Sequence, residues 1–315
     1  MYFVVNILIV DSLRKPPLKS ALHHWWPRSL SRFWADDTGI ARQLWWNGRE
    51  VTSRPETFGA IKNAHHIKLR DEGTVWDMSF EQAFSRADSQ FPGLVDWLGT
   101  LESKTVDASA PLVARLCAQP LPIERKKQLS ECLASLIVRS PYSRNMIKLT
   151  AEYGQQALGL RAGVSKALIA ANMRGCQEAF AKAMNGGGKF AVLSAHTKEF
   201  IFGEGFLHNF PSFATTVFSP RCIVPVTPTI TLIYLRPVSY RSPPELVTIR
   251  LSDDEIEFFN DTIQVYSKDF IFYRNKKPSV IPAFGQREFL QYQYNDTAWL
   301  GYFLSEIAHF SPTLA

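Results

Sequence analysis

The feature that most constrains the fold is a change of residue pattern at 185–189, where the chain reads Asn-Gly-Gly-Gly-Lys. Before this point, from about residue 79 to 186, apolar side chains recur at helical spacing. After it, short apolar runs are separated by turn residues, as in strands. Consecutive glycines break regular structure because they lack a Cβ atom. The chain therefore predicts a helical layer followed by a sheet, which is the α+β class.

Four stretches before the glycines predict helices. The first takes Ser79 as its cap and is interrupted at Pro92, since proline lacks the N–H group that a helix interior needs. The second carries leucines on one face and ends or restarts at Pro141. The predicted helices span 79–103, 122–140, 143–160 and 165–184. Together they form the central helical layer of the predicted fold.

A β-hairpin is predicted ahead of these helices and a mixed sheet after them. Asn47-Gly48 is a favoured type I′ turn pair between two strand-like runs. Prolines within 222–237 indicate sheet edges or bulges. Ser252, followed by three acidic residues, predicts the start of one late helix over 252–267. The remaining predicted strands span 189–195, 199–205 and 269–275.

Residues 21–315 are predicted to form a single α+β domain after an N-terminal extension, residues 1–20. Within it we distinguish a hairpin region (21–75), a helical region (79–186) and a sheet region (189–290). The apolar run at the start stops after about ten residues, fewer than a bilayer-spanning helix needs, and no other stretch reaches the length of such a helix. The four cysteines lack CxxC spacing and indicate single, mostly buried thiols. We therefore expect a cytoplasmic protein without a membrane partner.

Positive charge is concentrated in 121–190, which holds eleven Lys and Arg against four acidic residues, whereas the whole chain carries +6. Such a region can attract nucleic acid, a nucleotide or an anionic lipid. The alternative is a solvated helix surface with no anionic partner.

The candidate catalytic residues come from three motifs that contain histidine. The first, 23–34, reads HHWWPRSLSRFW and places His24 before an aromatic segment. The second pairs His65 with His66. In the third, glycines flank Glu204, and His208 and Asn209 follow. A carboxylate with a histidine and an amide can perform acid–base chemistry or bind a metal, and the alternative is a polar turn that closes a hairpin.

Catalytic roles are predicted for His24, Glu204 and His208, and no metal ligand is assigned because spacing such as HExxH is absent. The nature of any cofactor is unknown at this stage.

Arginines and amides supply the candidate substrate-binding residues. Arg139 and Arg144 flank a proline near a helix end, where they can clamp a phosphate or pair with acids of a neighbouring helix. Asn260 and Gln264 share one face of the late helix, where they can bridge main-chain groups or contact a ligand. With Asn209, these residues form the predicted binding set.

Six motifs in the same order resemble the bacterial domain of unknown function 4238 family. These motifs are HHWWPRSLSRFW, FGAIKNAHHIKL, SLIVRSPYSRN, EFIFGEGFLHN, VPVTPTITLIYLRP and NDTIQVYSKDFIFYR. The resemblance covers about 23–275. It implies roles for His24, Pro27 and Trp34, for Arg139, Pro141 and Arg144, and for Glu204 and Asn260. The chain departs from that family in carrying Glu204 where Asp is more usual, and Gly205-Phe206 where Asn-Pro is common.

Two functions follow from these observations. The first is a bacterial effector, in phage defence or a toxin-like role, that acts on nucleic acid or a nucleotide through the His, Arg, Glu and Asn residues. The second is a non-catalytic module that senses a ligand or a protein partner, with Trp25, Trp26, Trp45 and Trp46 as stacking or interface surfaces. A third interpretation is that the motifs only specify the fold.

Overall fold

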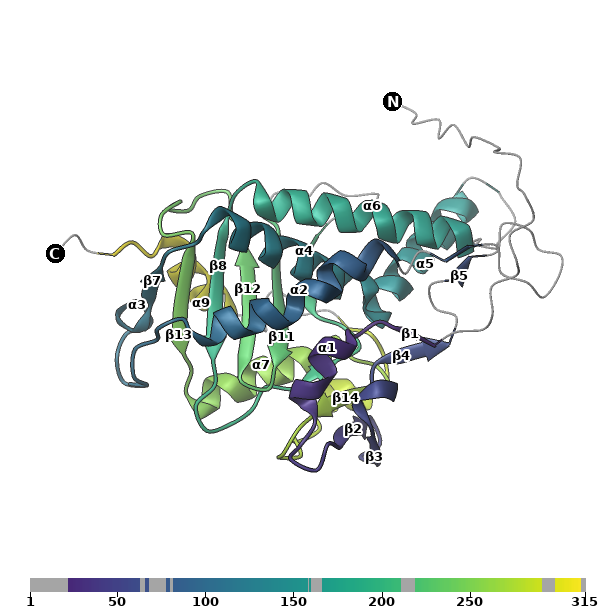
Figure 1. The fold of residues 1–315 in the computed structure, drawn as a ribbon, viewed down its shortest axis with the longest axis horizontal. Coiled ribbons are helices and arrows are strands. Elements are labelled where there is room, and N and C mark those ends of the chain that lie inside the picture. The colour runs from purple at the N-terminus through teal and green to yellow at the C-terminus, as the bar shows by residue number, and fades with distance from the viewer. Residues whose placement is uncertain are drawn as a thin grey trace.

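A computed structural model describes residues 22–62, 66–67, 78–79, 82–157, 159, 166–210, 219–290 and 298–312. The predicted extension at 1–20 and His65 lie outside this part of the chain. In the described part, helices pack on both faces of a mixed sheet (Figure 1). The predicted α+β class is confirmed.

The larger sheet has six strands in the order β10-β11-β12-β8-β13-β7. Only β8 and β13 run parallel, and the other neighbours are antiparallel. The strands are β7 Cys117–Gln119, β8 Lys189–Ser194, β10 Leu207–His208, β11 Arg221–Thr227, β12 Ile230–Leu235 and β13 Leu246–Arg250. A register shift between Pro225 and Thr227 confirms the bulge that the prolines of 222–237 indicate. Strands β7 and β13 were not predicted.

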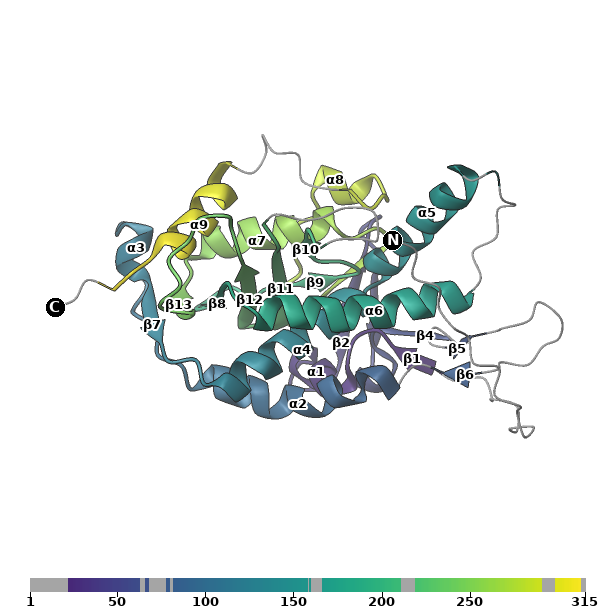
Figure 2. The same cartoon turned by 90° about the horizontal axis from the view of Figure 1, so that it is seen from above.

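Two helix layers enclose this sheet (Figure 2). On one side lie α4 Ile123–Arg139 and α6 Lys166–Asn185, with α2 Gln82–Gly99 packed against α4. On the other side lie α7 Asp253–Val265 and α9 Ala298–His309. Buried leucines at 129, 133 and 136 hold α4 in the core, as their spacing predicts.

The first helix differs from its prediction in two respects. It begins at Gln82, because Ser79 belongs to the short strand β6, Met78–Ser79. It also continues through Pro92. Proline cannot donate to the carbonyl four residues before it, here that of Asp88. The hydroxyl of Ser29 donates to that oxygen instead, at 3.3 Å, so a residue distant in sequence satisfies the group that Pro92 leaves unpaired.

A second sheet, in the order β3-β2-β14-β9, pairs strands from an early part of the chain with strands from later parts. Its strands are β2 Ala41–Trp45, β3 Glu50–Ser53, β9 Phe202–Gly203 and β14 Phe270–Tyr273. The predicted hairpin is confirmed as β2 and β3, but its turn is not type I′. Gly48 has φ +80° and donates to Trp45 at 2.8 Å, whereas Asn47 is not left-handed. The loop is therefore a three-residue turn with glycine at the left-handed position.

The predicted late helix is α7, and its start is fixed by a capping box. Ser252 accepts from the Glu255 N–H group, and the Glu255 carboxylate accepts from Ser252. Helix α9 was not predicted, although its buried residues Leu300, Phe303 and Ile307 have helical spacing.

The shorter elements complete the described chain. They are β1 Leu22–His24, α1 Arg28–Ser31, η1 Arg32–Trp34, η2 Pro55–Thr57, β4 Ala60–Lys62, β5 His66–Ile67, α3 Leu112–Arg115, α5 Pro141–Ala157 and α8 Pro282–Gly285. Among the described residues, no helix combines the length and hydropathy needed to cross a membrane.

The tryptophans of the HHWWPRSLSRFW motif lie in the core rather than on a surface. Trp25 and Trp26 are buried, and Trp26 stacks on Phe202 with ring centroids 4.0 Å apart. Phe202 stacks in turn on Phe272. Because offset aromatic pairs add to the stability gained by burial, this motif joins the N-terminal segment to the second sheet. The expected stacking surface on Trp25 and Trp26 is wrong for this reason.

Candidate functional site

Arg139 forms an ion pair inside the helical layer. Its Nη2 and Nη1 atoms donate to Asp88 on α2 at 2.7 and 3.1 Å, and its Nε atom donates to Ser135. The guanidinium also lies over the Phe84 ring, 4.8 Å from its centroid. Of the two predicted alternatives for Arg139, the structure shows the pair with an acid of a neighbouring helix.

His24 lies near this ion pair. Burial is the main cause that lowers the pKa of His24, the positive charges of Arg28 and Arg139 add to it, and a hydrogen bond to Glu56 opposes it. That bond joins Nε2 to the Glu56 main-chain oxygen at 2.9 Å. The histidine is therefore held neutral against the main chain of η2.

Glu204 directs its carboxylate into the turn that follows α7. Its Oε2 atom accepts from the N–H groups of Lys268 (3.0 Å), Asp269 (2.5 Å) and Phe270 (3.2 Å). Successive N–H groups of this kind form an anion-binding concavity. Burial raises the pKa of Glu204 to about 7, and the three N–H donors oppose that rise. The carboxylate thus binds the main chain of its own protein.

The flanking glycines allow Glu204 to approach so closely. A Cβ atom on Gly203 would lie 1.9 Å from the Ser267 hydroxyl, and one on Gly205 would lie 2.4 Å from the Tyr266 oxygen. Glycine is required at both positions because a side chain would meet the Ser267 side chain at the first and the Tyr266 main chain at the second.

His208 contacts the start of α5. Its Nε2 atom lies 3.1 Å from the Ser143 hydroxyl, which is hydrogen-bonded to the Ser140 hydroxyl. Ser140 also accepts from the Ser143 N–H group and caps the helix. Burial lowers the pKa of His208 to about 4, and its Nδ1 atom has no partner among the described residues. A neutral imidazole beside a hydroxyl is the arrangement of a nucleophile and its base.

The N–H groups at the start of α5 are already hydrogen-bonded, however. The Tyr142 N–H group donates to the main-chain oxygen of Glu204. The Ser143 N–H group donates to the Ser140 hydroxyl, and the Arg144 N–H group donates to the main-chain oxygen of Ser140. These donors therefore cannot also stabilise an oxyanion beside Ser143.

The predicted amide residues bridge main-chain groups. Asn260 accepts from Ile201 at 2.9 Å and donates to Glu199 at 3.0 Å. Gln264 likewise accepts from the Ile281 N–H group at 3.0 Å and donates to the Ser279 main-chain oxygen at 2.9 Å. Asn209 joins the two ends of the 209–221 connection, donating to Ser219 and accepting from Arg221. These contacts agree with the bridging alternative, and a ligand contact by any of these residues stays a prediction.

The structure brings together only part of the predicted set. The corner between α4 and α5 places Arg139 near His24, Tyr142 against Glu204, and Ser143 against His208. The side chains of Asn260 and Gln264 are hydrogen-bonded to other segments, 199–201 and 279–281 respectively. None of these residues lines the larger cavity described below.

Much of the basic charge of 121–190 is balanced by acids. Lys126 pairs with Glu245, Lys148 with Glu152, and Arg174 with Glu178, in addition to the pair of Arg139 with Asp88. This region therefore presents less free positive charge than its composition indicates.

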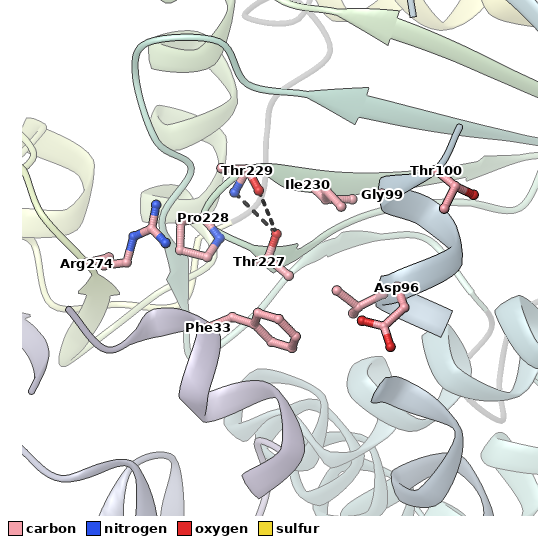
Figure 3. A pocket seen from close by; sticks show the side chains of 10 residues that line it. Phe33, Asp96, Gly99, Thr100, Thr227, Pro228, Thr229, Ile230 and Arg274 are labelled. Carbon is pink, nitrogen blue, oxygen red and sulfur yellow. Dashed lines mark hydrogen bonds between the residues drawn. The ribbon is translucent and has the colours of Figure 1, made fainter. Parts of the chain in front are cut away.

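A cavity of about 420 Å³ opens between η1, the end of α2 and the turn joining β11 to β12 (Figure 3). We name it the Phe33–Asp96 cavity. Its lining residues are Phe33, Val95, Asp96, Gly99, Thr100, Thr227, Pro228, Thr229, Ile230 and Arg274. Figure 3 shows Asp96 and Arg274 toward opposite ends, with Phe33 and Thr227 between them.

Hydrogen bonds fix the threonine hydroxyl groups of this cavity. The Thr227 hydroxyl accepts from the Thr229 N–H group at 3.2 Å and lies 3.3 Å from the Thr229 hydroxyl. The Thr100 hydroxyl donates to the Trp97 oxygen. Asp96 is exposed and makes no hydrogen bond or ion pair with a described residue. The lining of the cavity therefore includes an exposed carboxylate as well as threonine hydroxyl groups that are held by hydrogen bonds.

Sequence reasoning missed these lining residues because four segments that are distant in the chain supply them. Phe33 belongs to the motif that opens the described chain, but Asp96 and Thr100 are ordinary residues of a predicted helix. The prolines of 222–237 were interpreted only as sheet edges or bulges, although the Thr-Pro-Thr sequence at 227–229 is a local signal for a turn between two strands.

Metal and thiol chemistry find little support in the described residues, where no three His, Cys, Asp or Glu side chains come together as metal ligands. The cysteines are free, as expected, and burial raises the pKa of Cys222 to about 12. Such a thiol is a poor nucleophile at neutral pH.

The comparisons with known proteins return no match, whether against protein-family models, curated proteins or solved structures. The resemblance to the domain of unknown function 4238 family remains a prediction.

Proposed function

We propose that the protein is a non-catalytic binding module that holds a small neutral ligand in the Phe33–Asp96 cavity. The ligand would carry a ring with a face that can pack on an aromatic side chain and neighbouring hydroxyl groups, features that nucleosides and monosaccharides share. The observation that supports this most is the unpaired Asp96 carboxylate in a 420 Å³ cavity that also exposes an aromatic ring. Cavities of this size are typical of small-molecule sites.

The charges of the cavity favour a neutral ligand over a phosphate. Arg274 donates to the Glu199 carboxylate from Nε at 2.8 Å and again from Nη2, so its charge is balanced. Asp96 has no such partner among the described residues. The net charge at the cavity is therefore negative, and an anion would be repelled.

The polar groups suit vicinal hydroxyls. A carboxylate accepts two hydrogen bonds from adjacent hydroxyl groups, as acidic residues do on the ribose of dinucleotides. Thr229 and Thr100 add hydroxyl groups near the rim, and Phe33 offers a face for a sugar or base. Because the hydroxyls of Thr100 and Thr227 are already held by hydrogen bonds, less entropy is lost when a ligand binds.

A catalytic role on nucleic acid or a nucleotide has less support. Arg139 directs its guanidinium to Asp88, and Glu204 directs its carboxylate to three N–H groups. Both side chains would have to leave these partners before they could contact a substrate.

Calorimetric titration with nucleosides and monosaccharides tests the proposal. A ligand with the roughly 19 heavy atoms of adenosine, at about −0.3 kcal/mol each, would bind with Kd near 0.1 mM. Asp96→Asn should weaken binding about tenfold or more, because it removes one charged acceptor. Adenosine and ribose titrations distinguish a nucleoside from a free sugar.

Two controls make the result specific. Asp37→Asn removes the same charge from an exposed turn outside the cavity and should leave binding unchanged. Glu204→Gln should also bind normally, because Glu204 does not line the cavity. Equal weakening by Asp37→Asn and Asp96→Asn, or the lack of saturable binding by every nucleoside and sugar, would overturn the proposal.

A further inference from the structure

A second, smaller cavity lies at the other side of the large sheet, between the start of β11, the end of β12 and α9. Its volume is about 170 Å³, and the polar side chains that line it are Ser219, Arg221, Ser305 and His309. Leu235 and Leu304 form part of its apolar wall. We name it the Arg221 cavity. It shares no residue with the Phe33–Asp96 cavity.

Arg221 is a cation without a counter-charge in the described structure. Its Nε atom is buried and has no hydrogen-bond partner there. No Asp or Glu side chain lines the cavity. An unpaired guanidinium with a buried donor is costly, since arginine remains charged at any physiological pH. By contrast, the buried Arg139 and the half-buried Arg274 each have a carboxylate partner.

The main chain holds Arg221 in place. Its N–H group donates to the Asn209 side chain at 2.7 Å, its oxygen accepts from the Asn209 N–H group, and it pairs with Leu235 across β11 and β12. On the opposite wall, Ser305 and His309 lie one helical turn apart on α9 and line the same cavity. Polar groups from two separate elements therefore line one open cavity.

We propose that the Arg221 cavity binds a small oxyanion, inorganic phosphate or the phosphoryl group of a small phosphomonoester. Arginine donates two parallel hydrogen bonds to such oxygens, and serine hydroxyls and imidazole supply further donors. The volume admits a phosphate with one or two waters, each occupying about 30 Å³, but is smaller than the cavities that hold whole nucleotides. This site is independent of the proposed function at the Phe33–Asp96 cavity.

Binding of inorganic phosphate to the full chain, measured by calorimetric titration at fixed ionic strength with chloride as the reference anion, tests the proposal. Saturable one-to-one binding is expected for the wild type. Arg221→Gln should weaken binding at least about tenfold, because the forked, charged donor is lost. Arg236→Gln is the matched control, since it removes the same charge from a residue near the end of β12 that does not line the cavity. It should change the affinity less than about threefold, the size of a screened surface effect.

A parallel titration with glycerol phosphate distinguishes the two sources of the phosphoryl group. Tighter binding than that of inorganic phosphate identifies a phosphomonoester, and weaker binding identifies the free anion. Thermal unfolding without phosphate provides an independent readout. Arg221→Gln should unfold at the wild-type temperature or above it, because an unpaired charge is removed. No saturable binding by either anion, equal losses in Arg221→Gln and Arg236→Gln, or a lowered unfolding temperature of phosphate-free Arg221→Gln would overturn the proposal.

Discussion

Arg139 and Asp88 are joined by two hydrogen bonds, of 2.7 and 3.1 Å, that connect α4 to α2. The arginine side chain is almost fully buried, whereas that of Asp88 is 37% exposed. The pair thus places a guanidinium inside the helical layer and leaves one edge of its carboxylate partner in solvent. Its role is to fix the position of α2 against the corner where α5 begins.

Arg139→Ala should lower the free energy of unfolding by about 3 kcal/mol, the lower end of the range for breaking a buried pair, because Asp88 is partly solvated. Arg139→Lys should recover less than half of that loss, since a lysine cannot form the fork. Urea denaturation measures both effects. A double-mutant cycle with Asp88→Ala should give a coupling above about 1 kcal/mol. Additive losses would show that the two side chains stabilise the fold separately.

Local sequence signals predicted the helices well because those signals act over one or two turns. The Ser252 and Glu255 capping box and the leucine spacing of α4 require no information from elsewhere in the chain. The partner of Arg139 could not be assigned in this way, because Asp88 is 51 residues distant. The sequence left a phosphate and a neighbouring acid as equal alternatives, and only the packing of α2 on α4 decides between them.

The candidate site was harder to predict than the fold for the same reason. The glycines on both sides of Glu204 predicted a tight turn with a carboxylate at a strand end, but they could not show that this carboxylate accepts hydrogen bonds from 268–270. Similarly, Pro92 is tolerated within α2 because Ser29 replaces the missing donor. In each case a tertiary contact determines the outcome, and no spacing rule encodes it.

Glu204→Ala should lower the free energy of unfolding by about 3 kcal/mol or more, since three N–H groups lose their shared acceptor. Glu204→Gln should cost about 1 kcal/mol, because its side-chain oxygen can still accept from the same turn. Chemical denaturation at neutral pH compares the two variants. If both lose the same stability, the negative charge rather than the hydrogen bonding is what the turn requires.

Gly205→Ala should destabilise the protein by about 3 kcal/mol or more, because the added Cβ atom would meet main-chain and Tyr142 atoms that cannot move away. A Cβ atom at this position would lie 2.4 Å from the Tyr266 main-chain oxygen and 2.5 Å from the Tyr142 Cβ atom. Gly175→Ala is the matched control in the exposed middle of α6, where nothing lies within 4 Å of the added atom. This control should gain about 1 kcal/mol from helix propensity. Thermal unfolding of the pair distinguishes close packing from a general intolerance of alanine.

His208 should make the stability of the fold depend on pH below 7. Burial lowers its pKa from 6.5 to about 4, so at intermediate pH the unfolded chain binds a proton that the folded protein does not. The stabilisation is therefore complete above pH 6.5 and is lost as the pH falls toward 4. Between pH 7 and pH 5 the loss from this residue is about 2 kcal/mol. His208→Gln, which keeps a polar group within reach of Ser143, should remove this part of the pH dependence. Urea denaturation of both proteins at pH 7 and pH 5 measures it, and parallel losses of stability in the two proteins would assign the acid sensitivity to other groups.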